Sequence, residues 1–237
     1  MEVAMELEEL RNNLESVRDS IARAAARAGR NPEDVLLLPV TKTLGADVVE
    51  QAWQLGIRQV GENKVQEILS KKEVMGEKMQ FHMIGHLQRN KVHQVLDKVC
   101  LIHSVDSVRL AEEINREAEK KGLTARILLE LNVAREESKY GILEEDLDAL
   151  LQNLARFQHI RVEGLMTVAP FVENPEENRK IFRRMREIFI DIRQKKVNNI
   201  DMQILSMGMT NDYEIAVEEG ATIVRVGTGL FGHRQKK

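Results

Sequence analysis

The sequence is poor in several features that would assign it to a specialised class of protein. Its 237 residues include one cysteine, Cys100, so no disulfide can form within the chain. A lone cysteine in an apolar run is typical of a small buried hydrophobic residue and fits a reducing compartment. The chain has no run of about 18 apolar residues and no signal-peptide segment at its acidic start. We therefore expect a cytoplasmic protein that does not associate with a membrane.

An excess of charge of one sign is also absent. The formal net charge is -3 and the isoelectric point is about 6.1, so the composition gives no indication of a nucleic-acid partner. The short basic end, residues 233–237, is expected to be a solvated tail. With 43% hydrophobic and 31% charged residues, the composition is typical of a soluble globular protein with a substantial core.

No proline-rich or glycine/serine-rich linker divides the chain, so we expect one domain over residues 1–237. Residues 1–30 are expected to form an N-terminal helix, because leucine, valine and isoleucine recur every three or four positions between Met5 and Ala28. Strand-like and helical runs alternate after it. The strand-like runs are Val35–Val40, Gln59–Gly61, Phe81–Ile84, Val99–His103, Ala125–Leu131, Arg161–Met166, Met202–Leu205 and Thr222–Val226.

Helical patterns separate these runs. They cover Ala46–Leu55, Lys64–Lys71, Asn90–Leu96, Val108–Lys121, Glu144–Leu154, Glu176–Lys195 and Tyr213–Glu219. Eight such units predict an α/β protein of the (β/α)8 or TIM barrel class, at the small end of its size range. Pro39 is unusual for a central strand, since proline has no N–H to donate, and it suggests an irregularity there.

Lys42 follows the first strand-like run and has the same parity as Leu36, Leu38 and Val40. If the strand continues to position 42, this lysine points inward with those side chains. An ordinary lysine, with a pKa of ~10.4, is almost wholly protonated at neutral pH. A desolvated lysine tuned to a pKa of ~7–8 is partly neutral and can form a Schiff base with an aldehyde. The alternative is a solvated lysine that flanks a strand.

Unusual residues gather where the predicted strands end, which is where TIM barrels place their active sites. The segment Ser206–Asp212 leads into a helix, and helix starts bind anions through unpaired N–H groups. Phosphate often binds after strands seven and eight of such barrels, so Ser206 and Gly208 are candidate phosphate ligands. A capping box formed by Asn211 and Glu214 is the structural alternative.

The last predicted strand carries Arg225 and is followed by Gly227, Thr228, Gly229 and Gly232. The glycines match G-x-G-x-x-G, but no further strand and acidic residue follow, so a dinucleotide site is not expected. Their backbone amides can instead approach a phosphate. Arg225 alternates with Val224 and Val226, and an inward arginine needs an acceptor or an anionic partner. A structural ion pair is the alternative for this residue.

Three other patterns leave the chemistry open or exclude it. Asn63 is a candidate site residue, but with Gln66 it also fits a helix cap. His82 and His86 lie four residues apart on a strand and turn, without a cysteine or carboxylate cluster, so no metal site is expected. No serine stands in a G-x-S-x-G nucleophile elbow.

Five motifs in this order resemble the pyridoxal phosphate homeostasis protein family, whose members are similar to the N-terminal barrel of alanine racemase. They are Val40-Thr41-Lys42-Thr43, Gly61-Glu62-Asn63-Lys64-Val65-Gln66-Glu67, Phe81 to Lys91, Ser206-Met207-Gly208-Met209-Thr210 and Val224 to Gly232. The resemblance implies a barrel that holds pyridoxal 5′-phosphate (PLP) covalently on Lys42 as a Schiff base. It further implies Ser206, Gly208, Gly227 and Thr228 as phosphate ligands and Arg225 as the partner of the pyridine nitrogen.

The resemblance also places Asn63, Met166 and His86 near the cofactor ring. His86 stands where many relatives carry proline, which leaves a contact from this position open. It implies a non-catalytic protein of PLP homeostasis and amino-acid and keto-acid balance, with apo forms of PLP-dependent enzymes as candidate recipients of the cofactor. The alternative is an amino-acid racemase, which needs an acid/base on each face of the substrate carbon. Tyr140 and Tyr213 are the only tyrosines. A phosphate-binding barrel without a Schiff base is a third interpretation.

Overall fold

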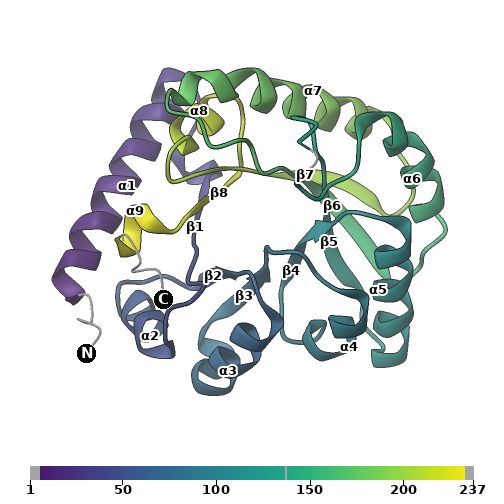
Figure 1. Cartoon of the computed structure of the whole chain (residues 1–237), viewed down its shortest axis with the longest axis horizontal. Coiled ribbons are helices and arrows are strands. Elements are labelled where there is room, and N and C mark those ends of the chain that lie inside the picture. Colours follow the sequence, from purple (N-terminus) through teal and green to yellow (C-terminus); the bar gives the residue numbers. More distant parts are fainter. Residues whose placement is uncertain (1–5, 137, 233–237) are drawn as a thin grey trace.

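Eight parallel strands make up one sheet in the computed structural model, which describes residues 6–136 and 138–232. The strand order is β1-β8-β7-β6-β5-β4-β3-β2, and helices surround the strands (Figure 1). A parallel bridge between Val40 and Gly61 joins β1 to β2, so the barrel is nearly closed. The (β/α)8 barrel expected from the sequence is confirmed. The predicted basic tail, residues 233–237, lies outside the described residues.

The strands are short and alternate with the helices. They are β1 Leu36–Pro39, β2 Gln59–Glu62, β3 Gln80–Met83, β4 Leu101–Val105, β5 Ala125–Glu130, β6 Ile160–Met166, β7 Ile200–Met209 and β8 Ile223–Val226. The α-helices are α1 Leu7–Arg27, α2 Ala46–Gln54, α3 Val65–Met75, α4 Val92–Val95, α5 Val108–Lys121, α6 Leu147–Leu154, α7 Arg179–Lys195, α8 Tyr213–Glu218 and α9 Thr228–Phe231. Of the helices in the described ranges, none is long and apolar enough to cross a membrane.

Two strands differ from their predicted bounds in a way that affects the candidate site. β4 ends at Val105 rather than His103, so His103 lies inside the strand. β7 runs through Ser206 and Gly208 to Met209, although these residues were expected to have left the strand. The register of β7 against β8 shifts between Ser206 and Met209, because the end of β7 bulges.

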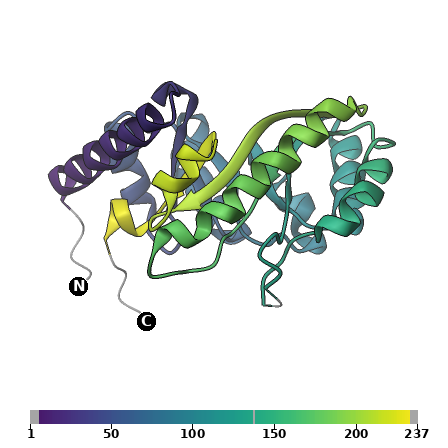
Figure 2. The same cartoon turned by 90° about the horizontal axis from the view of Figure 1, so that it is seen from above.

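Within the described residues, the N-terminal helix α1 begins at Leu7, ends at Arg27 before the predicted residue 30, and buries the predicted face. Residues 1–5 of the predicted helix lie outside the described residues. Leu10, Leu14, Val17 and Ile21 are buried, and the helix lies beside α8 and α9 (Figures 1 and 2). Arg27 in its last turn forms ion pairs with two glutamates of α8. The helix therefore covers the part of the barrel wall formed by its last strands.

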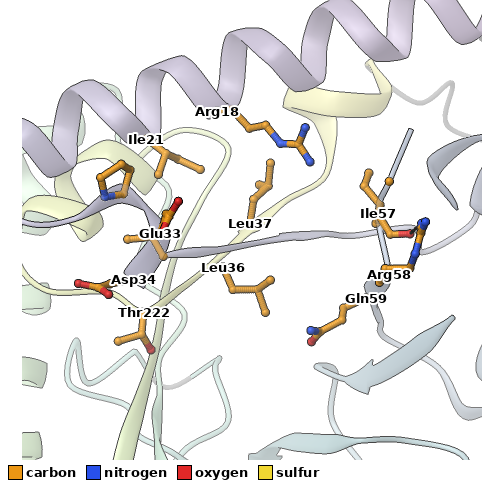
Figure 3. Close-up of a pocket in the computed structure, with 13 residues that line it drawn as sticks. Arg18, Ile21, Glu33, Asp34, Leu36, Leu37, Ile57, Arg58, Gln59 and Thr222 are labelled. Carbon is orange, nitrogen blue, oxygen red and sulfur yellow. Dashed lines mark hydrogen bonds between the residues drawn. The ribbon is translucent and has the colours of Figure 1, made fainter. Parts of the chain in front are cut away.

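Pro39 sits where β1 has no strand beside it on one side. The N–H groups of Leu36 and Val40 donate to the β8 side, whereas the N–H of Thr41, two residues after Pro39, donates to the Gly61 carbonyl in β2. The missing N–H of Pro39 therefore faces β2, where the two strands have separated and no ladder bond is lost. A cavity of about 600 Å³ opens in this seam and is lined in part by Leu36, Arg18 and Gln59 (Figure 3).

Alternation along β8 separates the barrel interior from the helix layer. Val224 and Val226 belong to the core between sheet and helices, and Arg225 between them is buried on the other side. A second apolar cluster fills the barrel interior and includes Leu38, Leu128 and Met166. Polar side chains in the interior therefore lie directly next to this apolar layer.

Candidate functional site

Lys42 lies just beyond the carboxyl end of β1, but the reason given for its direction was wrong. β1 ends at Pro39, so strand parity does not extend to position 42, and Lys42 is exposed rather than inward. It occupies a turn that the N–H of Leu44 closes onto the carbonyl of Thr41, with Thr43 at φ 64°. The lysine is thus presented by a turn at the mouth of the barrel.

Side chains from β2 and α3 hold this turn on both sides of Lys42. The hydroxyl of Thr41 donates to Glu62, and the Lys71 ammonium donates to Glu62 Oε1 at 2.6 Å and to the Thr41 carbonyl at 2.8 Å. The N–H of Thr43 donates to Glu67 at 2.6 Å. Glu62 and Lys71 are buried, so breaking one partner leaves an uncompensated charge in the protein. The network fixes the backbone that carries Lys42.

Glu62 carries an orphaned oxygen within the network. Its Oε2 atom is buried and has no hydrogen-bond partner among the described residues. Burial raises the pKa of this carboxyl, and the hydrogen bonds from Lys71 and Thr41 act in the opposite direction. The capping box proposed for Asn63 and Gln66 was wrong, since Lys64 is the N-cap of α3 and no side chain caps that helix.

Arg225 points into the barrel, as its alternation with two valines indicated. Its Nη1 donates to Ser206 Oγ at 2.6 Å and its Nη2 donates to the carbonyl oxygen of Thr167 at 2.8 Å. Burial lowers its pKa to about 10, which leaves the guanidinium charged at neutral pH. These two contacts use two of its five N–H groups. No carboxylate of the described residues lies within salt-bridge distance of this guanidinium, so the structural ion pair considered for Arg225 is not formed. Glu130 and Asp212 stabilise the charge only at longer range.

Ser206 faces the barrel interior. It is fully buried, and its hydroxyl contacts Arg225 and His103 Nδ1, the latter at 3.0 Å. The side chain of Ser206 therefore belongs to the surroundings of the arginine. Binding of a phosphate by Ser206, expected from the sequence, stays a prediction.

The ends of β7 and β8 are tied together by a few polar contacts. Asp212 accepts from the N–H of Met209 at 2.7 Å and from Asn178 Nδ2 at 2.8 Å. The N–H of Gly229 donates to Thr210 Oγ1 at 3.2 Å. The capping box of Asn211 and Glu214 was wrong, since Asp212 is the N-cap of α8. Asn211 donates instead to the Val172 carbonyl.

Gly208 is required by the packing of this region. Its φ is 88°, and a Cβ atom there would lie 2.5 Å from Ala216 Cβ and 3.0 Å from Tyr213 Cα. The strand end therefore packs directly on the start of α8. Gly227 and Thr228 follow β8 at the start of α9, beside this bulge. The two glycine-containing segments predicted to bind phosphate are thus neighbours at the mouth.

The remaining predicted site residues have different surroundings. Asn63 is half-buried at the end of β2, and a Cβ on Gly85 would lie 2.4 Å from its carbonyl oxygen. Met166 is the last residue of β6, is buried in the barrel interior and is the register partner of Ser206. Both lie at carboxyl ends of strands, as predicted. Met166 packs in the apolar layer of the interior, and the backbone of Asn63 lies against Gly85.

Sequence reasoning missed several buried polar residues near Arg225. Glu130, the last residue of β5, has its pKa raised to about 7 by burial and by Asp106, against the attraction of Arg225. His82 and His103 are both buried and contact each other. Their positions in the strands could have indicated that they point into the barrel, since they alternate with outward-facing apolar residues.

His86, left unassigned by sequence, lies at the rim. Its ring stacks on that of Tyr140 at a centroid distance of 3.8 Å, and its Nδ1 lies 3.3 Å from Asp106. In the described part of the chain, no group of three or more histidine, cysteine, aspartate or glutamate residues is arranged to hold a metal ion.

The mouth therefore combines a lysine amine, a buried arginine with N–H groups to spare, and two adjacent glycine-containing turns. Strand β1 pairs with β8, with Leu38 opposite Arg225, so the lysine and the arginine come from neighbouring strands. An amine can bond covalently to a carbonyl carbon, an arginine can donate to a ring nitrogen, and turn amides can bind an anion. The donor set suits a ligand that carries all three groups.

Comparison with known proteins agrees with this arrangement. The family described as "Alanine racemase, N-terminal domain" matches residues 7–235. The pyridoxal phosphate homeostasis protein of Aquifex aeolicus is 42% identical over 223 residues, which cover 94% of this chain and 97% of that protein. This chain belongs to the pyridoxal phosphate homeostasis protein family.

Solved structures of proteins of similar length share the fold. A protein described as unknown from Bifidobacterium adolescentis superposes with a TM-score of 0.90 at 36% identity and covers 95% of each chain. PipY of Synechococcus elongatus PCC7942, whose structure has PLP bound, gives a TM-score of 0.79 at 34% identity. That comparison covers 90% of this chain and 100% of PipY.

Glu130 gives a prediction on the pH dependence of stability. Its pKa rises from 4.5 to about 7 on folding, so the folded protein holds this proton more tightly than the unfolded chain. The resulting stabilisation is complete below pH 4.5 and is lost as the pH rises through 7. Relative to Glu130→Gln, the unfolding free energy of the wild type should fall by about 3 kcal/mol over that range. Urea titrations of both apo proteins at several pH values measure this difference.

Glu112→Gln is the control for that measurement, since Glu112 is exposed on α5. Its stability should follow the wild type at every pH. Parallel curves for Glu130→Gln and the wild type would show that Glu130 does not titrate as described.

Proposed function

We propose that this protein binds PLP at the carboxyl ends of β1, β7 and β8 and acts in the homeostasis of that cofactor. Arg225 is the observation that carries the proposal. It is a buried charge with only neutral acceptors bonded to it, beside the strand that leads to Lys42. Membership of the family and the PLP-bound structure of a 34% identical relative support this assignment.

Each residue at the mouth has a chemical role in this proposal. The Lys42 amine bonds to the cofactor's aldehyde carbon as a Schiff base, and Arg225 donates to the pyridine nitrogen. Gly208, Gly227 and Thr228 bind the phosphate through the segments after β7 and β8, and Asn63 and Met166 flank the ring. Ser206 acts through Arg225, because its hydroxyl contacts the guanidinium.

The identity of the ring-nitrogen partner favours binding without turnover. Bound PLP supplies an electron sink whose strength increases when its ring nitrogen is protonated. A permanently charged arginine donates to that nitrogen and discourages its protonation. We therefore propose a cytoplasmic carrier that buffers PLP, influences amino-acid and keto-acid balance, and has apo forms of PLP-dependent enzymes as candidate recipients.

Covalent attachment at Lys42 can be tested by reduction with borohydride. The wild type incubated with PLP should retain one phosphopyridoxyl group, and peptide mass spectrometry should place it on Lys42. Lys42→Ala should lose this label, because the other amine at that turn, on Lys71, is buried and bonded to Glu62 and to the Thr41 carbonyl. Its thermal unfolding should stay close to that of the wild type. Absorbance in the visible range provides a second reading of the linkage.

Lys64→Ala is the matched control. Lys64 is exposed and follows β2 at the same end of the barrel, so its variant should be labelled as fully as the wild type. A label that persists in Lys42→Ala at wild-type level would place the linkage on another residue.

An amino-acid racemase is the second candidate, and Tyr140 is the observation in its favour. This tyrosine is 58% exposed and lies in the segment after β5, on the opposite side of the barrel from β1. Its ring is stacked on His86, which packs it against the rim. Tyr213 is the first residue of α8 and packs against the core around that helix.

A direct assay separates the two candidates. PLP-loaded protein should not racemise D- or L-alanine faster than the same concentration of free PLP, as followed by chiral chromatography. Inversion well above that background, lost in Tyr140→Phe, would establish racemase activity and overturn the carrier proposal.

A further inference from the structure

A chain of hydrogen bonds crosses the barrel interior and ends on Arg225. Gln59 Oε1 lies 2.8 Å from His82 Nε2, and His82 Nδ1 lies 2.9 Å from His103 Nε2. His103 Nδ1 lies 3.0 Å from Ser206 Oγ, which is 2.6 Å from Arg225 Nη1. The five residues come from β2, β3, β4, β7 and β8. We call this chain the histidine relay.

Both histidines of the relay are neutral at physiological pH. Burial lowers the pKa of His82 to about 4 and that of His103 well below its ordinary value, and the charge of Arg225 acts in the same direction on His103. A neutral imidazole has one nitrogen that donates and one that accepts. The hydrogen-bond partners at the two ends therefore determine which nitrogen carries the proton.

The groups at the two ends of the relay require the same direction of hydrogen-bond donation along it. At one end the Gln59 oxygen can only accept, so His82 carries its proton on Nε2 and accepts on Nδ1. His103 must then donate from Nε2 to His82, which leaves its own Nδ1 as an acceptor. At the other end Arg225 can only donate to Ser206, so the serine oxygen accepts from Arg225 and its proton goes to His103 Nδ1. Every donor then points from Arg225 toward Gln59.

We infer that His103, supported by His82, is a positioning residue for Arg225 and thereby for the pyridine nitrogen of PLP. Because His103 takes the proton of Ser206, the serine oxygen presents only lone pairs to Arg225, and the guanidinium has one bonded orientation. The Thr167 carbonyl fixes Nη2 at the same time. This inference rests on the proposed function, in which Arg225 donates to the cofactor.

The far end of the relay lies at the seam between β1 and β2. Gln59 lines the cavity there, with Leu36 across from it (Figure 3). The two histidines are 3% and 0% exposed, so they are shielded from water between this cavity and the mouth. The relay is therefore a polar path that runs beside the apolar cluster of the barrel interior.

The tautomers can be measured on the apo protein by 15N NMR of selectively labelled histidine. His82 and His103 should both be neutral with the proton on Nε2, which gives distinct shifts for the two nitrogens of each ring. His82→Gln and His103→Asn assign the signals. A proton on Nδ1 of either ring, or a charged imidazolium at pH 7, would overturn the relay. This measurement needs no cofactor, so it remains decisive if PLP binding fails.

The effect on the cofactor is tested with two substitutions of one residue. His103→Leu removes the acceptor for Ser206, whereas His103→Asn keeps an oxygen close to the place of Nδ1. PLP affinity should weaken about tenfold or more in His103→Leu, with a shifted absorption maximum of bound PLP, and should recover toward wild type in His103→Asn.

Leu101→Ala is the control for general destabilisation. Leu101 is on β4, as is His103, and packs in the barrel interior. This variant should lower the thermal midpoint without shifting the absorption maximum of bound PLP. Identical spectra and affinities for His103→Leu and the wild type would refute a positioning role, as would a change in His103→Leu that Leu101→Ala reproduces. Failure of the wild type to bind PLP would instead refute the proposed function.

Discussion

The structure depends on how the barrel accommodates the buried charge of Arg225. A guanidinium inside a protein is costly unless acceptors surround it, and the cost is several kcal/mol when they are missing. Here a serine hydroxyl and a backbone carbonyl provide the acceptors, from β7 and from the residue after β6. The positions of three neighbouring strands are thereby coupled, and Arg225 is held one strand away from β1, the strand that leads to Lys42.

The two ends of the barrel differ in how tightly β1 is hydrogen-bonded to its neighbouring strands. Along β8 it forms a regular ladder, while toward β2 it is bonded only at Val40 and Thr41, near the mouth. The seam below is open, and Pro39 is tolerated because its missing donor faces that opening. The carboxyl end is consequently the more tightly joined one. There, Glu62, Lys71 and Glu67 hold the turn that presents the lysine.

Much of the fold and part of the site could be predicted from sequence, because both follow from local patterns. Alternation of apolar residues located the eight strands, and the same alternation placed Arg225 inside the barrel. It failed for Lys42, since parity applies only within a strand and β1 ends three residues earlier. The predicted end of β7 at Leu205 was wrong as well, because a bulge near the end of this strand was not visible in the sequence.

The contacts missed by sequence reasoning are those between distant strands. His103 and Ser206 are 103 positions apart and meet only because the barrel closes across its interior. The two histidines looked unremarkable as single residues, and their pairing with Arg225 depends on register. Capping explanations for Asn63 and Asn211 were reasonable by spacing, but the N-cap positions are held by Lys64 and Asp212, and neither side chain caps its helix.

A crystal structure of the protein loaded with PLP tests the central claim most directly. The account predicts the pyridine nitrogen about 3 Å from the Arg225 guanidinium, with continuous density from the aldehyde carbon to Lys42 and the phosphate against Gly227 and Thr228. PLP bound elsewhere, for example in the seam between β1 and β2, or with its phosphate on Arg225, would contradict it.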